Sequence, residues 1–363
     1  HLEITKMKNS FYLKYLVIAI ISIHSQSNCY GQNLESTIDS LLQEKYSENT
    51  PGGVFLIAQK ENIIYKKAFG LSNLELSIPM QTDNVFEIGS ITKQFTAVAI
   101  LILMEKGKLN LNDEITKFIP DYPTNGYRIT IHHLLTHTSG IKDFTKIKGL
   151  NEISKKDLTP SELINFFKNE PIDFAPGDQF KYNNSGYAIL GYIIELITKQ
   201  SYSDFVSENI FKKLKMLTSQ YASHYEVIQN RASGYHNKNG YINNREVSFT
   251  IPYSSGALMS TVDDMFKWQM AIKKNLLISK EATKKAFTNY TLNNGKPINY
   301  GYGWHIKAMH QIVIREHGGA IFGFKSMAVY IPESDIYVIA LTNCDCNSPT
   351  TITRKIAELV LKN

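Results

Sequence analysis

The sequence has few cysteines, no hydrophobic run near its start that is long enough to cross a bilayer, and no block of like charges. Three cysteines in 363 residues exclude a disulfide-stapled scaffold. The charges that produce the net value of +6 are interspersed along the chain, which argues against a nucleic-acid partner. An apolar fraction of 43% and a charged fraction of 20% are ordinary for a globular protein with one large domain or two smaller ones.

The first part of the chain has the pattern of a targeting segment. Lysines precede the apolar run 16–23, and small residues follow it, which is typical of a secretory signal peptide. We expect cleavage after Gly31 and export to the periplasm or the cell exterior. A lipid anchor on Cys29 is disfavoured, because Gln26 stands where a lipoprotein signal normally has leucine.

Removal of this segment leaves Cys344 and Cys346. If both lie on a strand, their side chains point the same way but are poorly placed for disulfide torsions. We therefore expect them to pack near a strand end without a bridge, and we disfavour a metal at the pair.

Strand patterns occur near both ends of the remaining chain, and helical patterns flank them. Each end carries two strand-like runs joined by a short polar turn, which predicts a hairpin. The two hairpins are expected to pair in one antiparallel sheet covered by helices, giving an α+β fold. The expected strands are 53–58, 63–68, 326–331 and 337–341, and the expected helices at the ends are 34–46 and 350–361.

The middle of the chain has mainly helical patterns. This predicts an α/β sheet domain formed by residues 32–105 and 296–363, with a mostly helical domain over 106–295. A cleft between two such parts is a common place for an active site.

A serine and a lysine three residues apart, Ser90 and Lys93, stand at the start of a strongly apolar helical segment. Residues at this spacing share one face of a helix. A neutral lysine amine can then take the proton of the serine hydroxyl and make it a nucleophile. A second pair at this spacing, Ser139 and Lys142, lies in a turn, so we interpret Ser139 as structural.

Two further groups are weaker candidates when each is taken alone. Tyr182 and Asn184 lie on a loop before a helix, where they could relay a proton and hold a substrate amide; the alternative is a surface turn. His317 and Gly319 lie where paired glycines could let a ligand approach a strand edge; the alternative is a hairpin with a surface histidine.

Three histidines, His132, His133 and His137, suggest a metal site by their spacing alone. A catalytic zinc motif needs a glutamate after the first histidine of the pair His133 and His137, and Leu134 stands there. We therefore expect these histidines to be satisfied polar groups at a helix end, with no metal and no cofactor.

Taken in order, Ser90-x-x-Lys93, Tyr182-x-Asn184 and His317-x-Gly319 resemble the serine β-lactamase and penicillin-binding-protein superfamily. The resemblance is greatest to the branch of class C β-lactamases, D-alanyl-D-alanine carboxypeptidases, D-aminopeptidases and related esterases. It extends from about residue 40 to 345, through blocks at 86–89, 134–140, 180–187, 300–304 and 317–319.

The resemblance implies an acyl-enzyme mechanism. Ser90 would be the nucleophile, Lys93 the base or its partner, and Tyr182 the group that passes a proton to the leaving group. Asn184 would bind the substrate amide, and the backbone N–H groups of Ser90 and Ala320 would form the oxyanion hole. Lysine and tyrosine both titrate near pH ~10, so the site must lower their pKa values before either can act as a base.

His317 departs from the Lys-Thr-Gly motif of many superfamily members. A histidine that is mostly neutral at pH 7.5 is a poor clamp for a substrate carboxylate, and Gly318 removes the threonine hydroxyl. If His317 binds a carboxylate, turnover of anionic substrates should fall between pH 6 and 8.

These features favour small D-amino-acid peptides, amides or esters as substrates, with β-lactams less favoured. Association with the cell wall would follow from a peptidoglycan-type substrate. The alternatives are a class C-like β-lactamase and a penicillin-binding or sensor protein that turns over slowly.

Overall fold

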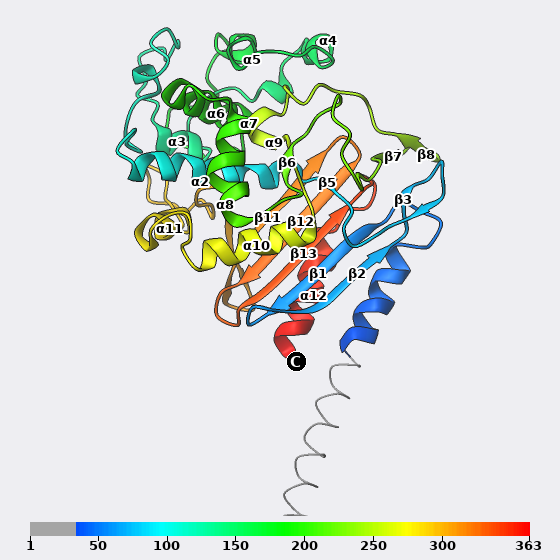
Figure 1. The fold of residues 1–363 in the computed structure, drawn as a ribbon. Coiled ribbons are helices and arrows are strands. Elements are labelled where there is room, and N and C mark those ends of the chain that lie inside the picture. Colours follow the sequence, from blue (N-terminus) through cyan, green and yellow to red (C-terminus); the bar gives the residue numbers. More distant parts are fainter. Residues whose placement is uncertain (1–33) are drawn as a thin grey trace, which may run out of the picture.

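The computed structural model describes residues 34–363, and the expected signal peptide and its cleavage site lie outside this range. The chain forms an antiparallel sheet with helices on both faces, shown in Figure 1. This confirms the predicted α+β class. Within residues 34–363, no helix is both long and apolar enough to span a bilayer.

The main sheet has six strands in the order β10-β11-β12-β13-β1-β2. The two predicted hairpins are present, and β1 pairs with β13 so that Gly53 lies opposite Thr342. The two ends of the chain thus meet in one sheet, as predicted. The strands are β1 (Gly53–Gln59), β2 (Asn62–Phe69), β10 (His305–Met309), β11 (Ile312–Ile321), β12 (Phe324–Ile331) and β13 (Ile336–Thr342).

Each face of the sheet is covered by helices with an apolar stripe. The helix over residues 34–45 and α12 (Thr350–Lys362) cover one face, where Leu42 and Ile356 are fully buried. On the other face, the Tyr337 hydroxyl donates to the Met265 carbonyl of α10 (Val262–Lys273) at 3.4 Å. Figure 1 shows α10 and α12 on opposite sides of the sheet.

The helix α2 (Thr92–Glu105) lies at the centre of the larger apolar core. Twelve of its residues are buried, and they lie on all sides of the helix. A helix that is apolar all round must be enclosed by other elements. This helix starts at Thr92, two residues after Ser90, so the serine is anchored to a helix that is buried in the core.

The middle of the chain, predicted to be mostly helical, contains most of the helices, but loops and short strands make up the larger part of it. The division into two domains remains a prediction, because α10 belongs to the 106–295 segment and yet covers the sheet. The helices of this part are α3 (Ile131–Leu135), α4 (Leu150–Ile153), α5 (Pro160–Phe167), α6 (Asn184–Thr198), α7 (Tyr202–Val206), a π-helical stretch (Ser207–Phe211), α8 (Lys212–Leu214), α9 (Tyr253–Gly256) and α11 (Lys280–Ala286).

The remaining elements are short strands and 3-10 turns. They comprise a three-stranded sheet of β5 (Phe86–Glu87), β9 (Leu258–Ser260) and β6 (Gln220–Tyr221), the pair β3 (Leu71–Asn73) and β4 (Ile78–Pro79), the hairpin β7 (Tyr235–Asn237) and β8 (Tyr241–Asn243), and 3-10 turns at η1 (Gly89–Ile91), η2 (Ile115–Lys117) and η3 (Phe144–Lys146).

The expectation for the two C-terminal cysteines is wrong, because Cys344 and Cys346 form a disulfide. They do not lie on a strand: β13 ends at Thr342, and the chain turns through both cysteines. The turn brings their Cα atoms to 5.2 Å, within the normal range for a disulfide. The prediction of no bridge assumed that both cysteines lie on a strand, whereas they lie in a turn.

Candidate active site

Ser90 lies in the 3-10 turn η1, directly before α2, close to the helix start predicted from the sequence. Gly89 has a φ of +53°, and a Cβ on it would lie 2.8 Å from the Ala320 nitrogen. A residue with a side chain there would push β11 away from the serine. The glycine before Ser90 therefore allows the turn to lie against β11.

Gly319, on β11, also allows the close packing between this strand and the segment before Ser90. A Cβ on Gly319 would lie 2.0 Å from the Ile88 carbonyl oxygen, which also accepts a hydrogen bond from the Ser326 hydroxyl at 2.8 Å. Gly319 thus lets β11 pack on the segment that presents Ser90, and the next residue, Ala320, follows at the exposed strand end.

Lys93 is fully buried, with its amine beside Ser90. Its Nζ lies 3.2 Å from the Ser90 Oγ, 2.8 Å from the Asn184 Oδ1 and 2.8 Å from the Ser255 carbonyl oxygen. Burial lowers the pKa of Lys93 to about 7, and the negative charge of Asp143 opposes this effect. The amine is therefore partly neutral at neutral pH.

Tyr182 lies over the lysine, with its ring centroid 4.8 Å from the Lys93 Nζ. Its buried hydroxyl makes no hydrogen bond of normal geometry to a described residue, although the nearby Ser90 hydroxyl favours its ionised form. Burial is the larger effect and raises the pKa of Tyr182 well above its ordinary value. The direction is opposite to the lowering that a tyrosinate base would need, so the phenol keeps its proton.

Asn184 begins α6 and turns its amide toward the lysine. Its Nδ2 faces Asp143, with oxygens at 3.4 and 3.5 Å, and the Asp143 carboxylate also accepts from the Thr145 amide. Sequence reasoning missed Asp143 and the Ser255 carbonyl. An aspartate two residues before a threonine predicts a turn cap, but only the fold places it near a lysine 50 positions earlier.

The environment of His317 differs from the surface position that the alternative interpretation assumed. His317 is 2% exposed, so it is not a surface histidine. Its Nδ1 donates to the Gly318 carbonyl at 2.7 Å, and its Nε2 accepts from the Tyr300 hydroxyl at 3.0 Å. Burial lowers the pKa of His317 well below its ordinary value. Titration of this group between pH 6 and 8 is therefore no longer expected, and direct substrate binding by His317 remains a prediction.

A pocket of about 430 Å³ opens beside Ser90. Asn184, Ser255 and Ala320 also line it, so the predicted site residues Ser90, Asn184 and Ala320 face one cavity. Polar side chains in the wall are Lys325 and the hydrogen-bonded pair His236 and Asp345. The rest of the wall is largely apolar, formed by Phe144, Leu150, Ile251, Pro252, Ile321 and Phe322.

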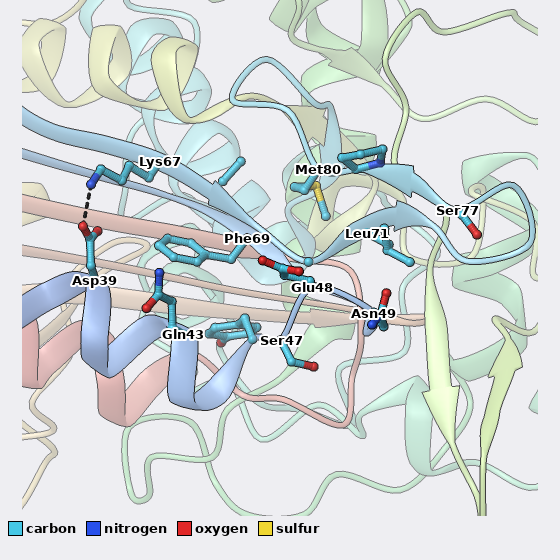
Figure 2. Close-up of a pocket in the computed structure, with 14 residues that line it drawn as sticks. Asp39, Gln43, Ser47, Glu48, Asn49, Lys67, Phe69, Leu71, Ser77 and Met80 are labelled. Carbon is cyan, nitrogen blue, oxygen red and sulfur yellow. Dashed lines mark hydrogen bonds and ion pairs between the residues drawn. The ribbon is translucent and has the colours of Figure 1, made fainter.

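A larger pocket of about 930 Å³ lies between the helix over residues 34–45 and strands β2, β3 and β4, as Figure 2 shows. Lys67 and Asp39 form an ion pair in its wall at 2.6 Å. None of the predicted site residues lines it. Volume alone would thus point to the wrong part of the molecule.

The remaining sequence candidates lie in separate environments. The Ser139 hydroxyl accepts from the Ile141 amide, and Lys142 pairs with Asp173, so the second serine–lysine pair is structural, as interpreted. His133 caps α3 through the Thr130 amide. In residues 34–363, no three histidine, cysteine or acidic side chains are arranged to hold a metal.

The buried lysine should make stability depend on pH. The pKa of Lys93 is lower in the folded chain than in the unfolded chain, so the unfolded state binds the extra proton between pH 7 and 10.5. The wild type should therefore gain stability as pH rises, by about 1.4 kcal/mol per unit from this group. Lys93→Met lacks this gain. Between pH 7.5 and 9.5, the free energy of unfolding of the wild type should therefore rise by about 2–3 kcal/mol more than that of Lys93→Met.

The matched control is Lys108→Met at an exposed lysine. Its unfolding free energy should follow that of the wild type at every pH. The free energy of unfolding is measured with denaturant at each pH. If it changes with pH in the same way for Lys93→Met and wild type, the pKa of the Lys93 amine does not differ between the folded and unfolded chain.

The comparisons with known proteins cover nearly all of the described chain. The model of the family "Beta-lactamase" matches residues 34–361. Penicillin-binding protein 4* of Bacillus subtilis (strain 168) is 30% identical over 329 residues, covering 86% of this chain and 72% of the relative. Protein flp of Staphylococcus aureus (strain MRSA252) is 26% identical, and the chain spans 64% of its length.

Solved structures agree in fold. The octameric penicillin-binding protein homologue from Pyrococcus abyssi superposes with a TM-score of 0.78 at 30% identity, covering 90% of this chain and 77% of that one. D-amino acid amidase from Ochrobactrum anthropi SV3 gives a TM-score of 0.78 at 23% identity, covering 91% and 98%, which shows a shared fold.

Proposed function

Because this chain belongs to the Beta-lactamase family and is a hydrolase of that fold, we propose that it is a serine hydrolase that forms an acyl-enzyme on Ser90. We propose small D-amino-acid peptides, amides or esters as its substrates. The chemistry is the attack of an activated hydroxyl on a carbonyl carbon, followed by hydrolysis of the resulting ester.

The observation that carries this proposal is the hydrogen bonding of the Lys93 amine. A neutral amine has two hydrogens and one lone pair. The Asn184 Oδ1 and the Ser255 carbonyl, each 2.8 Å away, can accept the two hydrogens. The lone pair is then left for the third neighbour, the Ser90 hydroxyl at 3.2 Å. This arrangement supports a base role for the amine, because its lone pair would then face the serine hydroxyl.

Tyr182 completes the proton path in this proposal. The raised pKa of Tyr182 keeps the phenol protonated at neutral pH, so it can pass its proton to the leaving group only as it takes another from the Lys93 ammonium. The proton that Lys93 takes from Ser90 can return through the phenol, whose ring lies over the amine. No step requires a free tyrosinate.

The developing oxyanion would be held by the backbone N–H groups of Ser90 and Ala320. The close packing of β11 on η1, which Gly89 and Gly319 allow, brings these two residues to the same pocket. Each such donor is worth roughly 3 kcal/mol in the transition state.

The buried, neutral His317 supplies no fixed positive charge for a substrate carboxylate. This supports amides and esters whose binding needs no cation at His317, while Lys325 is the cation in the pocket wall. A class C-like β-lactamase and a slowly deacylating penicillin-binding protein remain the alternatives that experiment must separate.

A substrate panel tests the proposal, with wild type and Ser90→Ala side by side. It should include D-amino-acid amides, a D-alanyl-D-alanine peptide, p-nitrophenyl esters, nitrocefin and a fluorescent penicillin. We expect Ser90-dependent turnover of an amide, peptide or ester. Fast nitrocefin hydrolysis would favour a β-lactamase, and a stable penicillin adduct without turnover would favour a penicillin-binding protein.

The apolar wall of the pocket predicts a preference for apolar acyl groups. Each additional buried methylene contributes about 0.8 kcal/mol, which corresponds to about fourfold in kcat/KM. In a series from p-nitrophenyl acetate to butyrate, kcat/KM should rise about fourfold per methylene until the pocket is full. Phe322→Ala should flatten this slope, because Phe322 is part of the wall. A wild-type slope of zero or below would show that the acyl group does not enter this pocket.

A further inference from the structure

A histidine that the proposed chemistry does not use, His137, is buried against the catalytic tyrosine. It follows α3 and is 1% exposed. Its φ is +59°, in the left-handed region that residues other than glycine rarely adopt. Such a conformation persists only where the surrounding contacts hold it. The question is therefore which contacts require a histidine there.

His137 binds the chain on both sides of Tyr182. Its main-chain oxygen accepts from the Lys181 amide at 3.0 Å, and its ring Nδ1 accepts from the Asn183 amide at 3.1 Å. These two bonds fix the residues before and after the tyrosine, so the tyrosine backbone has little freedom to rotate. One residue provides both bonds.

The imidazole also supports the tyrosine ring. The ring centroids of His137 and Tyr182 are 4.4 Å apart, with the planes tilted by 37°. On its other sides the imidazole contacts Tyr187 at 5.0 Å and Tyr300 at 4.8 Å. Tyr182 is thus held by two backbone bonds and by an aromatic platform.

The protonation of His137 is defined by its partners. Because Nδ1 accepts a hydrogen bond, the neutral ring carries its proton on Nε2. That atom is buried and has no hydrogen-bond partner among residues 34–363. Burial lowers the pKa of His137 well below its ordinary value, and Lys93, His317 and His305 act in the same direction. The ring stays neutral beside the amine.

An unpartnered buried N–H and a left-handed backbone both destabilise the fold. A residue kept only for packing could avoid the unpartnered N–H, since a phenylalanine fills similar space and leaves no buried donor without a partner. The feature that phenylalanine lacks is the acceptor for the Asn183 amide. We propose that His137 is a positioning residue that holds Tyr182 over Ser90 and Lys93. This inference rests on the proposed function, because it assigns a partner to the proposed proton donor.

The test is a double-mutant cycle on p-nitrophenyl ester hydrolysis with His137→Gly, Tyr182→Phe and both changes together. Glycine accepts the positive φ and keeps the main-chain bond to the Lys181 amide, so it removes only the ring and its acceptor. We expect H137G to lower kcat roughly 10- to 100-fold with little change in KM, as misplacement of a catalytic group does. In the Y182F background the same change should have almost no effect.

His137→Asn is the conservative variant, because asparagine tolerates the left-handed region and its Oδ1 can accept from the Asn183 amide. It should recover most of the lost kcat. Should H137G fail to fold, His137→Leu, which fills the space without an acceptor, replaces it against H137N. Equal losses in both backgrounds, or H137N as slow as H137G, would overturn the proposal.

Ser90→Ala is assayed alongside these variants. If it retains turnover, the proposed function fails, whatever the cycle shows. If it abolishes turnover while the cycle is additive, the proposed function stands and only the role of His137 fails.

Discussion

Ser90→Ala should abolish turnover of every substrate that the wild type hydrolyses, with a loss of kcat of about 10⁴-fold or more. The change removes one oxygen atom from a half-buried residue, so the fold should remain intact. The loss should appear in kcat, because the pocket walls that bind substrate are unchanged. Binding of a substrate analogue to the variant, measured by calorimetry, should confirm this.

Ser139→Ala is the matched control, because Ser139 is the other serine with a lysine three residues later. Its hydroxyl accepts from the Ile141 amide and its lysine is paired elsewhere. Ser139→Ala should keep kcat within about twofold, apart from a small loss of stability. Equal losses in the two variants would mean that the measured activity depends on folding and not on the nucleophile.

Lys93→Met should lower kcat by about 10²- to 10⁴-fold, the usual contribution of a positioned base. It should also change the pH profile. With the pKa of Lys93 near 7, wild-type kcat/KM should fall as the pH drops below about 7, because the protonated amine cannot accept the serine proton. The residual activity of Lys93→Met should lack this acidic limb.

Lys93→Arg provides the complementary control. The guanidinium keeps a positive charge at every accessible pH and cannot act as a base. If the lysine contributed through its charge, the arginine variant would retain activity. We expect it to be as slow as the methionine variant, measured over pH 5.5 to 9.

Sequence periodicity was sufficient to predict four of the six strands of the main sheet, and the expected strands did not include β10 and β11. The two terminal hairpins, the closing helix α12 and the buried α2 follow from local patterns of apolar residues and turn signals. Their pairing into one sheet also follows, since each hairpin alone would leave an apolar face exposed. The disulfide between Cys344 and Cys346 was missed, because a turn of only a few residues after β13 leaves no periodic signal.

The candidate site was also predictable only in part. Motif order placed Ser90, Lys93 and Tyr182 together, and the structure brings these three side chains to one point. Burial could not be read from the motifs, and burial determines the chemistry here: it lowers the pKa of Lys93 and raises that of Tyr182. The same limit applies to His317, whose two internal hydrogen bonds depend on long-range packing.

The most direct test of the central claim is mass spectrometry of the protein quenched during turnover of a slowly deacylated ester or penicillin. The account predicts a mass increase equal to one acyl group, or to one intact penicillin because its ring opens without loss of atoms, on the peptide that contains Ser90. The adduct should be absent from Ser90→Ala. Turnover without any adduct under conditions that trap slow deacylation, or an adduct on a different residue, would contradict it.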